Sequence, residues 1–258
     1  MQIDVKQEKL LGKNKRIKVL NSYVDVLNMH QTIELVEKYI TTKTPLHLMG
    51  VNADKINEMK HNNLLKEIVN KCGVINADGA SVVLASKYLG LPLPERVAGI
   101  DLMQKLISLS AQKGYSIYLL GAKESIVKKT ANVLKNDYPG LKLAGIHNGY
   151  FSDDEWKDIA QSLKEIEPDI VFVGITSPKK EYLIEYLQNK GIKSVFMGVG
   201  GSFDVISGYI PRAPKWMQNC NLEWLFRVIQ EPRRLFKRYF VGNFKFIKNI
   251  VCEKSDNR

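Results

Sequence analysis

Asp78 and Arg96 are the two side chains whose types and positions best suit chemistry. Asp78 lies near the end of the apolar run VINADG (74–79), where a partly buried carboxylate can act as a general base and take a proton from a hydroxyl group. The alternative is an N-cap, because the run leads into a helical pattern. Arg96, in LPERVAGIDL, could hold a diphosphate or orient a carboxylate, or it could be a solvated loop charge. The residues alone leave both alternatives open.

Glycines and small polar residues follow most of the apolar runs. Ligands of open α/β sheets bind beyond the carboxyl ends of the strands, where glycines let backbone N–H groups approach a diphosphate. On this basis the predicted ligand-binding residues are Asn52, Gly79, Gly121, Ala122, Gly174 and Ser177. The structural alternative is that these turns need glycine for their own geometry. No GxGxxG follows the first run and no GxxxxGK[ST] motif occurs, which argues against a dinucleotide-dependent dehydrogenase and a P-loop NTPase.

The elements that position these residues are short apolar runs alternating with helical patterns. Runs of nearly continuous apolar residues are typical of parallel strands covered on both faces. The predicted strands are 46–52, 74–79, 116–122, 141–147, 169–175 and 194–201, and the predicted helices between them are 54–70, 101–113, 123–136, 153–166 and 179–190. The alternation predicts an α/β fold with a Rossmann-like, doubly wound parallel sheet flanked by helices.

The balance of basic and acidic residues changes near residue 209. This change predicts an α/β domain over 1–208 and a basic helical appendage over 209–258. The appendage has eleven basic and four acidic residues, about +7 of the net charge of +11. Pro232 should interrupt its helices. Beyond Pro232 an apolar helical face and a basic one are expected: Phe236, Tyr239, Phe240, Ile247 and Val251 on the first, and Arg234, Lys237, Arg238, Lys245 and Lys248 on the second. Such a helix suits a membrane interface, although its apolar face could instead pack against its own domain.

Composition narrows the partners and the compartment. A net charge of +11 suggests an anionic partner: nucleic acid, an acidic lipid surface or a phosphorylated substrate. Three widely spaced cysteines form no metal-ligand pattern and indicate reduced thiols in a cytosolic protein. The N-terminus is too polar for a signal peptide, and no apolar run approaches the roughly 20 residues of a spanning helix. Membrane contact is therefore expected to be peripheral.

Two long motifs resemble the WecG/TagA/CpsF glycosyltransferase family. They are NADGASVVLASKYLGLPLPERVAGIDLM and GVGGSFDVISGYIPRAPKWMQNCNLEWLFRVIQEPRRLFKRYF, and the similarity extends from about residue 22 to about residue 247. The resemblance implies an inverting, metal-independent transferase without a cofactor, peripheral at the cytoplasmic face of the membrane. Family members typically move N-acetylmannosamine, or a related sugar, from a UDP-sugar to a polyprenyl-diphosphate-linked saccharide during teichoic acid, enterobacterial common antigen or capsule synthesis.

The resemblance also implies roles for particular residues. The family's proposed base falls on Asp78, and the arginine of its R-V-x-G-x-D motif falls on Arg96. The aspartate of its GG-x-F-D motif falls on Asp204, a candidate for the nucleotide. The arginines of its C-terminal appendage, thought to touch the lipid diphosphate, match Arg227, Arg233, Arg234 and Arg238.

The chain departs from the family pattern at two positions. Gly50 stands where a threonine is common, which removes a hydroxyl near the sugar. Lys180 replaces the glutamine of the P-K-Q-E motif, and this cation could bind the diphosphate or an acidic donor sugar such as a uronic acid. Both departures bear on which sugar is transferred.

Two other functions compete with catalysis. A nucleic-acid-binding protein could use the same basic appendage on phosphates, but no recognised RNA- or DNA-binding motif appears, so nucleic acid is not the expected partner. An inactive member of the family is the second alternative, suggested by Gly50 and Lys180. A homo-oligomer stays open.

Overall fold

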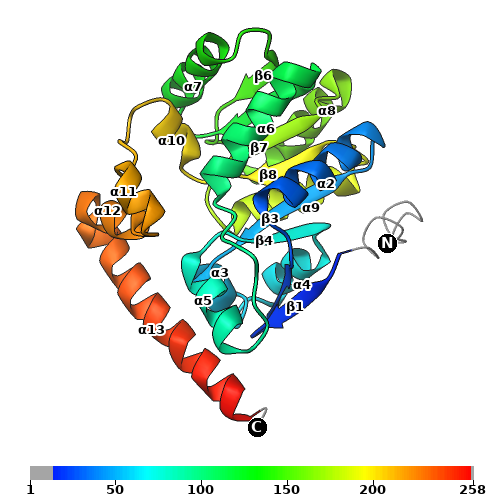
Figure 1. The fold of residues 1–258 in the computed structure, drawn as a ribbon. Coiled ribbons are helices and arrows are strands. Elements are labelled where there is room, and N and C mark those ends of the chain that lie inside the picture. The colour runs from blue at the N-terminus through cyan, green and yellow to red at the C-terminus, as the bar shows by residue number, and fades with distance from the viewer. Residues whose placement is uncertain (1–13, 257–258) are drawn as a thin grey trace.

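The computed structural model describes residues 14–256, apart from the side chains of Arg234, Lys237, Arg238 and Asp256. Its centre is a six-stranded, fully parallel sheet of order β4-β3-β8-β7-β5-β6 (Figure 1). The strands are β3 (Leu46–Val51), β4 (Val74–Ala77), β5 (Ser116–Gly121), β6 (Lys142–His147), β7 (Ile170–Gly174) and β8 (Val195–Gly198). Each lies within one of the six apolar runs, so the predicted Rossmann-like sheet is confirmed.

Helices cover both faces of this sheet. They are α2 (Met29–Thr41), α3 (Ala53–Glu58), α4 (Asn63–Lys71), α5 (Ala80–Tyr88), α6 (Gly99–Lys113), α7 (Glu124–Asp137), α8 (Trp156–Ile166) and α9 (Lys179–Asn189). Side chains alternate between the faces along each strand: Phe172 packs in the core cluster with α2, α6 and α7, whereas Val171 packs with α8 and α9. A third cluster lies between β3, β4 and the helices α3, α4 and α5. This double burial explains the continuous apolar runs.

Two helix boundaries show how local residues set the elements. The helix predicted over 153–166 is confirmed, and Ser152 and Glu155 form a capping box at a 3₁₀ turn, η1 (Asp153–Glu155), that leads into α8. The single helix expected over 54–70 is instead two helices, α3 and α4. Asn62 accepts a hydrogen bond from the backbone N–H of Leu65 at 3.0 Å and so caps a new helix inside the amphipathic pattern.

A small hairpin precedes the sheet. Its strands are β1 (Arg16–Val19) and β2 (Ser22–Asp25), paired antiparallel. Arg16 binds Asp25 within the hairpin and donates to the carbonyl oxygen of Gly73 at 2.9 Å. Asp25 in turn accepts from the backbone N–H of Ile75 at 2.7 Å, which ties the hairpin to β4.

The chain ends in α11 (Lys215–Asn219), α12 (Glu223–Gln230) and α13 (Pro232–Asp256), so a basic helical appendage is present and a new helix begins at Pro232. Figure 1 shows α13 as the long red helix beside α3 and α5. Phe246 and Ile250 of α13 are buried in the same cluster as residues of α3, and Asn57 donates to the carbonyl oxygen of Gly242 at 2.8 Å. The domain boundary at residue 208 stays a prediction. Within residues 14–256 no helix is both long and apolar enough to cross a bilayer.

Candidate active site

The chain leaves β3 and β8 toward opposite faces of the sheet. After β3, Ile56 of α3 packs in the cluster on one face; after β8, Phe203 of α10 (Ser202–Ile206) packs in the cluster on the other. Because β3 and β8 are neighbours, their carboxyl ends border a topological switch point, the usual ligand position in doubly wound sheets. Gly50 and Gly198 lie at these ends and contribute no side chains.

Asp78 is half-buried directly after β4, one strand from this switch point. Its Oδ1 atom accepts a hydrogen bond from the backbone N–H of Gly99 at 2.8 Å. Gly99 is the first residue of α6, whose own N-cap, Ala98, has no side-chain hydrogen bond to offer. The carboxylate therefore caps α6 and does not cap α5, the helix that follows it in sequence, where Gly79 is the N-cap. One carboxylate oxygen is thus held in place.

Gly50 leaves the carboxylate uncovered on the side of β3. A Cβ atom at Gly50 would lie 3.1 Å from the Cβ of Asp78 and 3.9 Å from its Oδ2. A side chain at this position would therefore contact Asp78 directly. The departure from the family's threonine is consequently a change at the carboxylate itself.

Arg96 binds protein groups at all three of its nitrogens. Nε donates to the backbone carbonyl oxygen of Asp78 at 2.7 Å, Nη2 donates to Glu223 Oε2 at 3.2 Å, and Nη1 donates to Asn221 Oδ1 at 3.5 Å. The sequence left three roles open for Arg96: binding a diphosphate, orienting a carboxylate, or being a solvated loop charge. These contacts match the second role, and the carboxylate that Arg96 orients is that of Glu223. A role of Arg96 in catalysis stays a prediction.

A second arginine holds the other oxygen of Glu223. Arg212 Nε donates to Glu223 Oε1 at 3.2 Å, and its Nη2 donates to Asp101 Oδ1 at 2.6 Å. Burial opposes a charge on Arg212, but the carboxylates of Asp101 and Glu223 outweigh it and raise the pKa of the guanidinium. The four side chains form a chain of ion pairs, Arg96–Glu223–Arg212–Asp101, between the α/β domain and the C-terminal helices.

Lys180 lies on the opposite side of the switch point, over the end of β8. A Cβ atom at Gly198 would lie 2.9 Å from Lys180 Cε and 3.4 Å from its Nζ, and the lysine Nζ is 3.8 Å from Glu181 Oε1. Glu181 is fully buried and is paired more closely with Lys55 of α3. The three side chains carry two positive charges and one negative, and Lys180 is the more exposed of the two lysines.

His47 adjoins this cluster from β3. Complete burial lowers its pKa to about 3, so the imidazole is neutral, although the charge of Glu181 acts to raise that pKa. The neutral ring adds no charge to the pair of Lys55 and Glu181.

The glycines at the ends of β5 and β7 have a structural explanation. A Cβ atom at Gly121, which has φ of 145°, would lie 2.5 Å from the carbonyl carbon of Gly174, and a Cβ atom at Gly174 would strike the Phe203 ring at 2.6 Å. Ala122, with φ of 57°, donates its backbone N–H to the carbonyl oxygen of Gly174 at 3.0 Å. Close backbone packing thus accounts for these residues without a ligand, and their substrate role stays a prediction.

The remaining predicted ligand residues are spread along the same edge. Asn52 caps α3 by accepting from the backbone N–H of Lys55 at 2.9 Å, and a Cβ atom at Gly79 would lie 2.8 Å from the Cβ of Asn52. Ser177 is exposed after β7, and Asp204 lies in the first turn of α10. The structure groups Asn52 and Gly79 near Asp78 and places Ser177 and Asp204 after other strands.

Comparison with known proteins identifies the family. The model of the Glycosyl transferase WecG/TagA/CpsF family matches residues 17–258. The chain belongs to this family. A Bacillus subtilis (strain 168) protein is 32% identical over 215 residues, 83% of this chain and 80% of the relative. A Staphylococcus aureus (strain MW2) protein is 31% identical over 222 residues, 85% of this chain and 87% of the relative. Both are named N-acetylglucosaminyldiphosphoundecaprenol N-acetyl-beta-D-mannosaminyltransferase, and this WecG/TagA/CpsF family member is accordingly a glycosyltransferase.

Of the four appendage arginines expected at the lipid diphosphate, the structure describes the side chains of two. Arg227 on α12 and Arg233 on α13 are exposed and make no side-chain hydrogen bond or ion pair with any residue that the structure describes. The other two arginines expected at the lipid diphosphate, Arg234 and Arg238, have side chains outside the described residues. Arg227 is four residues after Glu223, so both side chains project from one face of α12.

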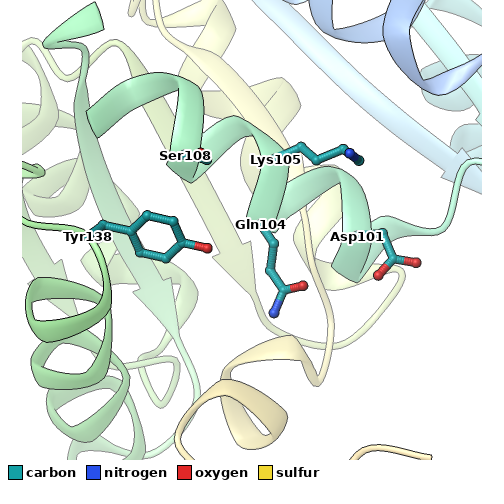
Figure 2. A pocket seen from close by; sticks show the side chains of 5 residues that line it. All are labelled: Asp101, Gln104, Lys105, Ser108 and Tyr138. Atoms are coloured by element: carbon teal, nitrogen blue, oxygen red, sulfur yellow. The ribbon is translucent and has the colours of Figure 1, made fainter. Parts of the chain in front are cut away.

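Two surface hollows lie along α6 and along α13. Figure 2 shows the first, about 310 Å³, with Asp101, Gln104, Lys105 and Ser108 along α6 and Tyr138 facing them. The second, about 750 Å³, lies between α3 and α13 and includes Lys245 and Lys248. Asp78 lines neither hollow, and the side chains of Asn221 and Glu223 are bound to Arg96 beside it. The start of α12 is thus linked through Arg96 to the backbone of Asp78.

Sequence reasoning missed Gly99, Asp101, Arg212 and Glu223 as partners of the site. The first two lie in the same PERVAGID motif as Arg96, and Glu223 lies in LEWLFR, so the family motifs contained them. Nothing in the local pattern indicates that these segments meet, because Arg96 and Glu223 are 127 residues apart.

Proposed function

We propose that this family member is an inverting glycosyltransferase of cell-surface polysaccharide synthesis. It transfers N-acetylmannosamine, its uronic acid or a related hexose from a UDP-sugar to a polyprenyl-diphosphate-linked saccharide, in teichoic acid or capsule assembly. The observation that carries the proposal is the oriented carboxylate of Asp78 beside the switch point, with bare Gly50 next to it. The names of the relatives support a polyprenyl-diphosphate-linked acceptor.

Asp78 is the general base in this mechanism. Its free Oδ2 takes the proton from the acceptor hydroxyl, whose oxygen forms a bond to the anomeric carbon of the donor. The bond between that carbon and the UDP oxygen breaks, and UDP leaves with the electron pair. Because the acceptor attacks opposite the leaving group, the configuration inverts. The Gly99 hydrogen bond fixes the carboxylate for this step.

Cationic side chains stabilise the charge on the diphosphates, and the proposal requires neither a metal ion nor a cofactor. Arg227 and Arg233 are exposed and engaged by no described residue, and Lys180 lies over the carboxyl end of β8. Charged groups held in place before the reaction are effective at meeting developing negative charge. Lys180 also favours a donor with an added anionic group, such as a uronic acid, over the neutral sugar.

The test is the release of UDP by the purified protein. UDP-N-acetylmannosamine, its uronic acid and UDP-N-acetylglucosamine are each incubated with and without a synthetic polyprenyl-diphosphate-linked N-acetylglucosamine. We expect one donor to give release that depends on the acceptor. Absence of release with every donor would contradict the proposal and favour an inactive member of the family.

The acceptor lipid requires the protein to reach a membrane, and we propose that α13 docks peripherally on an anionic, cytoplasmic membrane surface. Its apolar stripe, defined as Phe236, Phe240, Phe244, Ile247 and Val251, is exposed. A neighbouring face of the helix supplies the buried Phe246 and Ile250, so the residues of the stripe are not those that pack α13 on the domain. Tyr239, which the sequence also assigned to the apolar face, is half-buried and packs against Trp224 of α12. Lys245 and Lys248 beside it are exposed and suit anionic headgroups.

Replacing both Phe244→Ser and Ile247→Ser should weaken binding to anionic liposomes by about tenfold or more, because the two apolar side chains no longer enter the interface. Both side chains are more than half exposed, at 72% and 57%, so the fold should be unaffected. Co-sedimentation with vesicles measures the effect. The matched control is Leu64→Ser on α4, which is 57% exposed and away from the stripe. Equal binding by the double variant and the wild type would refute the role of the stripe.

A further inference from the structure

Glu223 joins the C-terminal helices to the loop that carries Arg96, and Arg96 in turn binds the backbone of Asp78. We propose that Glu223 is a positioning residue: held between Arg96 and Arg212, it seats α12 so that Arg227 faces the reaction centre. This inference rests on the proposed function, in which Arg227 meets a diphosphate. It assigns to Glu223 a role in the transfer step without contact with either substrate.

Both arms of this arrangement lead back to the same aspartate. Through Oε2, Glu223 binds Arg96, whose Nε holds the backbone carbonyl oxygen of Asp78 at 2.7 Å. Through Oε1, it binds Arg212, which holds Asp101 in the first turn of α6, and that helix begins at the Gly99 N–H that binds the Asp78 carboxylate. One carboxylate at the start of α12 is therefore linked to both segments that hold Asp78.

The burial of the partners makes the contact specific. The side chains of Arg96 and Arg212 are each 23% exposed and that of Glu223 is 16% exposed, so the charges are only partly accessible to water. Loss of one partner leaves the others partly desolvated and unpaired, which costs more than loss of a surface pair. The carboxylate of Glu223 thus lies between two arginines of other segments.

The helical spacing connects the contact to the chemistry. Glu223 and Arg227 are separated by one turn of α12, so fixing the first places the second on the same side of the helix. Arg227 is exposed and bound to no described side chain, so its guanidinium is accessible to a ligand. Release of Glu223 would remove the ion pairs that hold the start of α12 to Arg96 and Arg212, so Arg227 would be held less closely in place relative to Asp78.

The experiment compares Glu223→Gln, Arg212→Gln and the double variant with the wild type. Hydrogen exchange of the α12 amides reports whether the helix is seated, and UDP release with saturating donor and acceptor reports kcat. Glu223→Gln keeps the size of the side chain and removes its charge. We expect α12 exchange to accelerate by about tenfold or more while exchange in β3 and β8 is unchanged. We also expect kcat to fall by about tenfold or more with a smaller change in the KM for the donor.

The double variant tests whether Glu223 and Arg212 act together, and a surface variant serves as the control. If the two side chains act as one unit, the double variant loses about as much as the worse single variant, whereas independent roles would multiply the losses. Glu67→Gln, which removes a 65% exposed partner of Lys71, should change nothing.

Three outcomes overturn the inference: wild-type exchange of α12 in Glu223→Gln, faster exchange with an unchanged or raised kcat, and multiplicative losses. If the wild type itself releases no UDP with any donor, it is the proposed function that fails, and the exchange measurement still decides whether Glu223 seats α12.

Discussion

Replacing Asp78→Asn should lower the kcat of sugar transfer by about 10²- to 10⁴-fold, the range typical for loss of a general base. Asparagine keeps an Oδ1 atom that can accept the Gly99 N–H bond, so the cap of α6 and the local fold should persist. The amide cannot take a proton from the acceptor hydroxyl. The KM values should change little, because the carboxylate acts in the transition state. UDP release at saturating substrates measures the loss.

The control for this prediction is Asp137→Asn, at the exposed C-terminal end of α7. It removes an equal charge away from the switch point and should leave kcat unchanged. Thermal unfolding of both variants checks that the fold is intact. A kcat for Asp78→Asn within about threefold of the wild type would show that another group is the base.

Replacing Glu181→Gln should lower the free energy of unfolding by about 3–5 kcal/mol. Glu181 is fully buried against Lys55, and both Lys55 and Lys180 lie within ion-pair distance of its Oε1. The substitution leaves a buried lysine charge without its partner, and desolvation of that charge is the source of the loss. Urea unfolding followed by circular dichroism measures it.

A double variant separates loss of the partner from loss of packing. Glu181→Leu combined with Lys55→Met replaces the pair with apolar side chains of similar size, so most of the lost stability should return. If the double variant is as unstable as Glu181→Gln, the charge of Lys55 is not the cause.

The same residue predicts a dependence on pH. Burial acts to raise the pKa of Glu181, but the charges of Lys55 and Lys180 outweigh it and lower the pKa to about 2. A carboxyl group with a depressed pKa in the folded state stabilises the protein fully above its unfolded value, and the contribution is lost as the pH falls toward the folded value. The stability difference between the wild type and Glu181→Gln should therefore be constant near neutral pH and narrow between about pH 4.5 and pH 2.

Part of the fold follows from the sequence because it depends on local patterns. A strand buried on both faces requires an apolar side chain at nearly every position, so runs such as DIVFVGI indicate a parallel sheet without further information. The start of α8 is a local capping box, and the spacing of Phe236, Phe240 and Ile247 sets one side of α13. Asn62 is an exception, since its cap divides an amphipathic pattern that reads as one helix.

Most of the candidate site was decided by tertiary packing. The sequence by itself singled out Asp78, through its place after an apolar run, and the family motifs supplied Arg96 and the appendage arginines. The start of α6 lies beside the end of β4, where Val97 donates its backbone N–H to the carbonyl oxygen of Ala77, and this made Asp78 the cap of a helix that begins 21 residues later. The docking of α12 brought Glu223 between Arg96 and Arg212. A local pattern records which face of an element is apolar, but contacts between charged side chains far apart in the chain depend on how those faces pack together.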